Sequence, residues 1–204
     1  MKTNSNTYTI IYSAIIVVVV AFLLAFVSQA LKAKQDANVA LDVKKQILNS
    51  LNIRGLGDSE AEAKYGEVVK SEETVGEQKL YTCEIDGQPV YVCTVKGMGL
   101  WGPVFGYISV AADKNTVYGA YFNHDSETAG LGAEIKDSQA WQEKFKGKKI
   151  NADADPDIEL GVAKKIEVPE SEVDAVTGAT LTSNGVSLML KEGLKPFMEI
   201  LKNK

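Results

Sequence analysis

The segment DAVTGATLTS, residues 174–183, places four hydroxyl side chains around a Gly-Ala pair just before a predicted helix. The first N–H groups of a helix have no partner within the helix, and they lie at the positive end of its dipole. This pattern favours a site for an anion such as phosphate. The alternative is simple N-capping by Thr182 or Ser183, which would explain those two hydroxyls but not the hydroxyl of Thr180.

Two further segments contain closely spaced glycines: GMGLWGP (residues 97–103) and ETAGLG (residues 127–132). Neither is a P-loop, and neither is a GxGxxG sequence that follows a strand and opens a helix. Taken singly, such glycines most often form turns, because glycine adopts conformations that other residues disfavour. Metal-cluster chemistry is not indicated, since the sequence has a single histidine and two cysteines.

The segments around these loops have the patterns of helices. Residues 184–201 carry an apolar stripe at helical spacing despite Pro196: Val186, Leu190, Leu194, Phe197 and Leu201. Residues 138–145 predict a helix with Ser138 as its cap and with Trp141 and Phe145 on one face. Amphipathic or acidic helices are also predicted over residues 32–53 and 58–65, separated by a glycine-rich break.

Period-two alternation predicts two β-hairpins. KLYTCEI (79–85) and VYVCTVKG (90–97) flank an Asp-Gly turn, and FGYISVA (105–111) precedes VYGAYF (117–122). Strands grouped together, with helices at the ends, indicate an α+β fold.

The first hairpin contains both cysteines. A three-residue turn over residues 87–89 would place Cys83 directly opposite Cys93. A disulfide is then one alternative, in an oxidising compartment. We interpret the pair as ordinary buried thiols, because the cross-strand geometry is often strained.

The N-terminal region predicts a membrane anchor. The apolar run over residues 10–27 contains no charge, and as a helix it would span roughly 27 Å, close to the thickness of a bilayer core. A cleaved signal peptide is the alternative, because Ser28-Gln29-Ala30 has small residues at cleavage-site positions. The run is longer than the apolar part of an ordinary signal peptide, which favours the anchor.

These patterns divide the chain into an N-terminal tail and anchor (1–31), a helical connector (32–78) and a C-terminal domain (79–204). The net charge of −5, with no basic cluster interleaved with aromatics, excludes a nucleic-acid partner. By the positive-inside rule, Lys32, Lys34, Lys44 and Lys45 would place the C-terminal domain in the cytoplasm.

DAVTGAT resembles the D-x-x-(S/T)-G-A-T signature of FMN-binding domains in which FMN is joined to the final Thr by a phosphoester bond. The whole chain resembles the family of the C subunit of the Na⁺-translocating NADH:quinone oxidoreductase. MKTNSNTYTIIYS, the single anchor, KGMGLWGPVFGYI, ETAGLG and TGATLTSNGV occur in the family's order. The G subunit of the ion-translocating ferredoxin:NAD⁺ oxidoreductase has the same domain, but the N-terminal segment favours the quinone-reductase family.

The resemblance implies a set of site residues around covalent FMN. Thr180 would be the acceptor of the FMN phosphate, with Thr177 as a supporting hydroxyl in the Thr177-Gly178-Ala179 turn. Asp174 would be the acid that a flavin transferase requires, or it would cap the turn. The other implied contacts are the loop of Glu127, Thr128, Gly130, Leu131 and Gly132, the covering side chains Leu100 and Trp101, and Lys164 or its neighbour Lys165.

The sequence departs from the family in one loop. The usual T-P-G-L-G is Thr128-Ala129-Gly130-Leu131-Gly132 here, so the loop lacks the rigidity of a proline. His124 lies one residue further from Glu127 than the usual His-x-Glu spacing. We therefore assign His124 no role and interpret it as an exposed loop residue.

The function implied by the resemblance is electron transfer. The chain would carry covalent FMN in a translocase that oxidises NADH, reduces quinone and exports Na⁺, with no catalytic residue of its own and no complete reaction alone. Its partners would be the other subunits, a flavin transferase and the bacterial inner membrane, with the C-terminal domain periplasmic despite the lysine count. A contrasting hypothesis is a membrane-anchored binding module without flavin.

Overall fold

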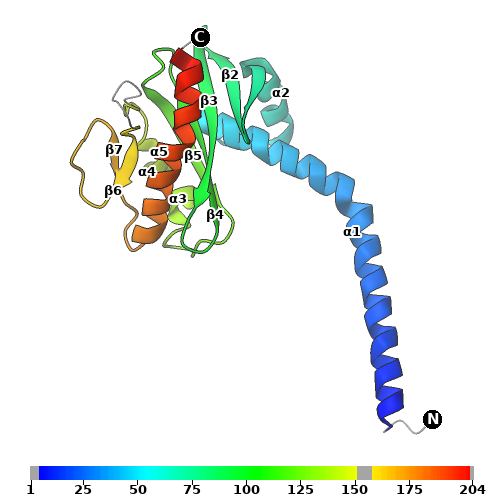
Figure 1. The fold of residues 1–204 in the computed structure, drawn as a ribbon. Coiled ribbons are helices and arrows are strands. Elements are labelled where there is room, and N and C mark those ends of the chain that lie inside the picture. Colours follow the sequence, from blue (N-terminus) through cyan, green and yellow to red (C-terminus); the bar gives the residue numbers. More distant parts are fainter. Residues whose placement is uncertain (1–4, 151–157, 203–204) are drawn as a thin grey trace. The chain divides into compact units, whose positions relative to one another are not determined.

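The computed structural model describes residues 5–150 and 158–202, drawn in Figure 1. The chain forms two compact units, residues 1–42 and residues 43–204. Helix α1 (Asn6–Ser50) is continuous, so the predicted anchor and the predicted amphipathic helix are one helix. Its N-terminal part has an 18-residue window of mean hydropathy 3.1, none of it buried, and its length and composition suffice to cross a membrane.

The centre of residues 43–204 is a five-stranded antiparallel sheet with strands in chain order. The strands are β1 (Val69–Val75), β2 (Gln78–Ile85), β3 (Gln88–Met98), β4 (Pro103–Val110) and β5 (Val117–His124). The two predicted hairpins are therefore confirmed, and they are joined through the pairing of β3 with β4. Strand β1 was not predicted, because only its two end residues are apolar and its five central residues are exposed.

The predicted register of the first hairpin is wrong. Asp86 and Gly87 alone form the turn, with φ of 50° and 75°, the left-handed conformations that suit a two-residue hairpin loop. Gln88 and Pro89 therefore belong to β3, and the register pairs Cys83 with Val90 and Leu80 with Cys93. The two cysteines are not opposite each other, and both are free thiols.

Both thiols lie in the core, so we expect them to be unreactive in the folded protein. Cys83 and Cys93 are 1% and 0% exposed, and burial raises the pKa of the Cys83 thiol to about 12 and raises that of Cys93 as well. Since the thiolate is the reactive form, a thiol reagent at pH 8 should label neither cysteine before unfolding and both after it. Mass spectrometry counts the labels. Labelling of one thiol in the folded state, or of none after denaturation without a reductant, would contradict this expectation.

Helices cover both faces of the sheet. Helix α5 (Thr180–Lys202) packs along β3, as Figure 1 shows, and buries the stripe of Val186, Leu190, Leu194 and Phe197. Helix α2 (Asp58–Val68) contacts β1 and β2. The last turns of α1 pack on the other face of the sheet. The side chain of Ser109 in β4 points to this face, because it follows the core residue Ile108, and its Oγ lies 2.8 Å from Ser50 Oγ.

Two short helices and two short strands complete the domain. Helices α3 (Glu134–Asp137) and α4 (Gln139–Glu143) pack on β5, and Ser138 caps α4 by accepting a hydrogen bond from Trp141 N. Trp141, Phe145 and Phe122 form one aromatic cluster, with ring centroids 5.0 to 5.4 Å apart. Strands β6 (Gly161–Ala163) and β7 (Glu172–Asp174) are parallel, and at three residues each they were not predicted from the sequence.

Candidate functional site

The three glycine-containing segments meet at the start of α5, and the buried carboxylate of Glu127 joins them. Glu127 Oε1 accepts a hydrogen bond from Trp101 N at 2.9 Å, and Glu127 Oε2 accepts one from Thr182 Oγ1 at 2.5 Å. The Glu127 side chain thus connects residues 97–103 with the first turn of α5. In the structure it serves as a connection between protein segments, and the cofactor contact that the resemblance implies for it stays a prediction.

Glycines allow this close approach. A Cβ on Gly132 would overlap Glu127 Oε2, and one on Gly99 would lie 2.5 Å from Glu127 Oε1. A Cβ on Gly185 in α5 would overlap the carbonyl oxygen of Met98. Gly99, Gly132 and Gly185 are therefore needed for packing around the carboxylate and against α5, beyond any role in turns.

The carboxylate of Glu127 is held in its ionised form. Burial tends to raise its pKa, but hydrogen bonds from Thr182 Oγ1 and from the backbone N–H groups of Trp101 and Leu100 lower it, and His124 lowers it further. The net pKa lies below the ordinary value for a glutamate.

His124 is the last residue of β5 and is half-buried, so its interpretation as an exposed loop residue is wrong. Its Nδ1 accepts a hydrogen bond from Glu127 N at 3.1 Å. His124 thus supports the turn that leads to Glu127.

The segment before α5 forms a tight turn. Gly178 has φ of 78°, a conformation that favours glycine, and Ala179 is buried. Ser183 Oγ accepts a hydrogen bond from Val176 N at 3.1 Å, and Thr182 donates to Glu127. Both residues lie inside α5, which begins at Thr180 rather than at residue 184, so neither N-caps the helix.

Thr180 occupies the first position of α5 and is exposed, as is Thr177 on the other side of the turn. Within residues 5–150 and 158–202, no acceptor bonds the backbone N–H groups of Thr180, Leu181 and Thr182. Three free N–H donors and the helix dipole therefore converge beside an exposed hydroxyl. This arrangement suits a phosphate bonded to Thr180.

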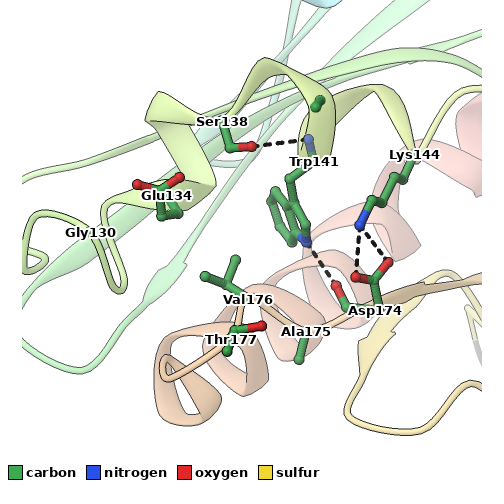
Figure 2. Close-up of a pocket in the computed structure, with 10 residues that line it drawn as sticks. Gly130, Glu134, Ser138, Trp141, Lys144, Asp174, Ala175, Val176 and Thr177 are labelled. Carbon is green, nitrogen blue, oxygen red and sulfur yellow. Dashed lines mark hydrogen bonds and ion pairs between the residues drawn. The ribbon is translucent and has the colours of Figure 1, made fainter.

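A cavity of about 320 Å³ lies beside the turn, between α3 and α4 on one side and residues 174–177 on the other (Figure 2). Three of the implied site residues line it, namely Gly130, Asp174 and Thr177, together with Trp141 and Lys144. Trp141 Nε1 donates to the carbonyl oxygen of Asp174 at 2.8 Å, and Lys144 Nζ lies 2.9 and 2.7 Å from the two carboxylate oxygens of Asp174. Sequence reasoning placed Trp141 on one face of a predicted helix and gave Lys144 no role, since the partner of both lies about thirty positions away.

The implied covering side chains are exposed and apolar. Leu100, Trp101 and Leu131 are 46%, 66% and 43% exposed, and a Cβ on Gly178 would lie 2.9 Å from Leu131 Cδ2. The loop of Thr128 and Gly130 is closed by hydrogen bonds from Leu131 N and Ala133 N to the carbonyl oxygen of Thr128, although it lacks the usual proline. An apolar surface thus borders the turn before Thr180.

Lys164 lies next to the turn of residues 174–179 in the backbone. It follows β6, whose last residue, Ala163, accepts a hydrogen bond from Ala175 N at 3.0 Å. Among the residues that the structure places, the Lys164 side chain has no hydrogen-bond or ion-pair partner. The same described ranges contain no group of acidic, histidine and cysteine side chains that could hold a metal ion.

Comparison with known proteins identifies a matching family and several relatives. Residues 99–195 match the family model of the FMN-binding domain. The C subunit of the Na⁺-translocating NADH-quinone reductase of Chlamydia muridarum is 35% identical over 145 residues, which cover 61% of this chain and 45% of the relative. The corresponding protein of Pasteurella multocida is 42% identical over 112 residues, covering 52% of this chain and 42% of the relative. The chain thus spans less than half the length of these two relatives.

Two solved structures have the same fold. The crystal structure of the C subunit of the Na⁺-translocating NADH-quinone reductase from Parabacteroides distasonis matches with a TM-score of 0.78 and 36% identity, over 85% of this chain and 98% of that chain. The crystal structure of NqrC from Shewanella oneidensis matches with a TM-score of 0.65 at 22% identity, over 80% of this chain and 97% of that chain, and it supports the fold alone.

Proposed function

Because the chain belongs to the family of the C subunit of the Na⁺-translocating NADH-quinone reductase, we propose that it carries FMN as a phosphoester on Thr180 and transfers electrons through it. The observation that carries this proposal is the exposed hydroxyl of Thr180 at the first position of a 23-residue helix. Three backbone N–H groups beside it are free to bind the phosphate oxygens. The electron-transfer chemistry belongs to the flavin, which accepts and donates electrons one or two at a time.

The surroundings of Thr180 fit the two ends of FMN. The phosphate is an anion, and the helix N-terminus stabilises anions. The isoalloxazine ring is flat and largely apolar, and the exposed side chains of Leu100, Trp101 and Leu131 offer it apolar contact. Lys164, with its free ammonium, would favour a negatively charged reduced flavin by Coulomb attraction.

Thr180 contributes one oxygen to the attachment. Its Oγ forms a bond to the phosphorus of an FMN phosphoanhydride supplied by a flavin transferase, and the anhydride P–O bond breaks. The electron pair of that bond leaves with the departing phosphate group, and the hydroxyl proton of Thr180 passes to a base of the transferase. The turn of Gly178 and the exposure of Thr180 leave the hydroxyl accessible to such an enzyme.

Within a complete reductase, the chain would relay electrons from NADH towards quinone, coupled to Na⁺ export by the other subunits. The apolar part of α1 supports a single-pass anchor in the bacterial inner membrane. We place the C-terminal domain on the periplasmic side. A covalent tether supports this placement, because it prevents loss of the cofactor where free FMN is scarce.

The test is to produce the full chain in cells with and without a flavin transferase and to examine a denaturing gel under ultraviolet light. We expect a fluorescent band only with the transferase, and mass spectrometry should find one FMN on the peptide that contains Thr180. A dark band with the transferase would contradict the proposal and favour a binding module without flavin. Copurification with an NADH-binding flavoprotein would separate the reductase from the ferredoxin-dependent relative.

A further inference from the structure

Hydrogen bonds to other parts of the domain hold the segment before Thr180 at successive residues. Ala175 N donates to Ala163 O in β6, and Val176 N donates to Ser183 Oγ in α5. Asp174 is held twice, by Trp141 of α4 and by Lys144, the residue that caps the C-terminus of α4, as Figure 2 shows. Trp141 Nε1 donates to its carbonyl oxygen, and Lys144 Nζ binds both of its carboxylate oxygens.

Helix α4 is held in place by buried packing and by hydrogen bonds. Trp141 is 5% exposed and packs against Phe122 and Phe145, with ring centroids 5.4 and 5.2 Å away. The side chain of Gln142, 1% exposed, donates to the carbonyl oxygens of Ile135 and Lys136, which fixes α4 to α3. Lys144 therefore directly follows a short helix that packing and hydrogen bonds hold in place.

The carboxylate of Asp174 does not cap its own turn. Within the ranges that the structure describes, its hydrogen bonds come from Lys144 alone, and none comes from a backbone N–H of residues 175–178. The acid of the DAVTGAT motif is thus directed away from Thr180 and towards α4. Its contact with Lys144 sets the position of the residue from which the acceptor turn begins.

We propose that Lys144 is a positioning residue for the attachment of FMN to Thr180, and that Asp174 acts in this step through Lys144. The proposal rests on the proposed function, because it concerns the same hydroxyl. A held Asp174 keeps the turn in one conformation, so that the Thr180 hydroxyl meets the transferase already oriented. Without the ion pair, the turn would sample conformations in which the hydroxyl is misplaced, and attachment would slow.

The contact is suited to this role because it contributes little to overall stability. The side chains of Lys144 and Asp174 are 45% and 49% exposed, and ion pairs of such exposure add little to the stability of a fold. A variant without the pair should therefore fold with an unfolding midpoint within about 5 °C of the wild type. A defect in attachment can then be read apart from a defect in folding.

The experiment measures the initial rate of covalent FMN incorporation into the full chain by a flavin transferase, with the unfolding midpoint as a check of folding. We expect Lys144→Met to slow incorporation about two- to fivefold, which is as far as an exposed ion pair can shift the conformation of the turn, and Lys144→Arg to restore most of the rate, because arginine keeps the charge and can donate to both carboxylate oxygens. Lys146→Met is the matched control, since Lys146 is a nearby exposed lysine outside the cavity lining. Its rate should equal that of the wild type.

The charge swap decides what Asp174 does. If Asp174 acts through Lys144, the double variant Lys144→Asp with Asp174→Lys should incorporate FMN faster than either single variant. A double variant as slow as Asp174→Lys would show that the transferase recognises the carboxylate of Asp174 directly, and it would overturn the proposal. A wild-type rate for Lys144→Met would also overturn it. A wild-type chain that takes up no FMN would instead contradict the proposed function.

Discussion

Replacing Thr180 by valine should abolish covalent FMN while leaving the fold intact. Valine keeps the branched shape of threonine but has no oxygen to bond the phosphorus. Thr180 is exposed at the start of α5, so the change removes no buried hydrogen bond. The fluorescence of the denatured band should fall to the background of cells without the transferase. We expect the unfolding midpoint to change little, as for most exposed positions.

Thr177→Val is the matched control, because Thr177 is an exposed hydroxyl three positions before Thr180 in the same turn. It should keep a fluorescent band, since it is not the acceptor. Thr180→Ser should also keep one, because serine supplies the same oxygen. A bright band from Thr180→Val, or a dark band from Thr177→Val with its mass unmodified, would show that Thr180 is not the acceptor.

Replacing Glu127 by leucine should have the largest effect on stability. Leucine removes the acceptor of Thr182 Oγ1 and of the backbone N–H groups of Trp101 and Leu100 in a site where Glu127 is 8% exposed. Buried donors without partners are costly, so we expect a loss of about 2 to 4 kcal/mol in the free energy of unfolding. Urea denaturation of the full chain in detergent measures this loss.

Glu127→Gln is the matched control for size and shape. The amide oxygen can still accept from the two backbone N–H groups, and the amide nitrogen can donate to Thr182 Oγ1, whose hydroxyl rotates to accept. We therefore expect a loss of about 1 kcal/mol. If the leucine variant were as stable as the glutamine variant, the carboxylate would not be the connection that joins the three segments.

The glutamine variant also reveals the sign of the pH dependence. The folded-state pKa of Glu127 lies below its unfolded value, which is near 4.3 for an ordinary glutamate. Its contribution to stability is therefore present above the unfolded pKa and is lost as the pH falls through the folded pKa. The difference in unfolding free energy between the wild type and Glu127→Gln should shrink as the pH is lowered from about 6 to about 3. A difference that grows over this range would contradict the ionised, hydrogen-bonded carboxylate.

The strands that were predicted are those with clear alternation and clear turn residues. The Asp86-Gly87 turn was recognised, but its length was not, because Pro89 resembles a turn residue and lies in β3 instead. Assigning Pro89 to the turn moved the pairing partner of Cys83 from Val90 to Cys93. The predicted turn left out Asp86 and took in Gln88 and Pro89, which moved the pairing partners across the whole hairpin by three residues.

The acceptor turn was predicted from its local sequence, whereas its support was not. Glycine and hydroxyl residues before a helix indicate an anion site through local geometry alone. The contacts that hold the turn come from distant segments: Glu127 reaches Thr182 across 55 positions, and Lys144 reaches Asp174 across 30. No periodicity links such positions, so the tertiary fold was needed to find Lys144 and the hydrogen bonds of Glu127 within the protein.

The 55-residue separation of Glu127 and Thr182 also determines the order in which the site is made on the ribosome. Glu127 and the glycine loops emerge first, and at about 5 to 20 residues per second the partner hydroxyl of Thr182 follows roughly 3 to 11 s later. During this interval the sheet hairpins can pair, because their contacts are local. The acceptor turn, by contrast, cannot dock until α5 has been synthesised. Under the proposed attachment to Thr180, flavin incorporation would therefore be a late step of biosynthesis, after the surrounding loops have folded.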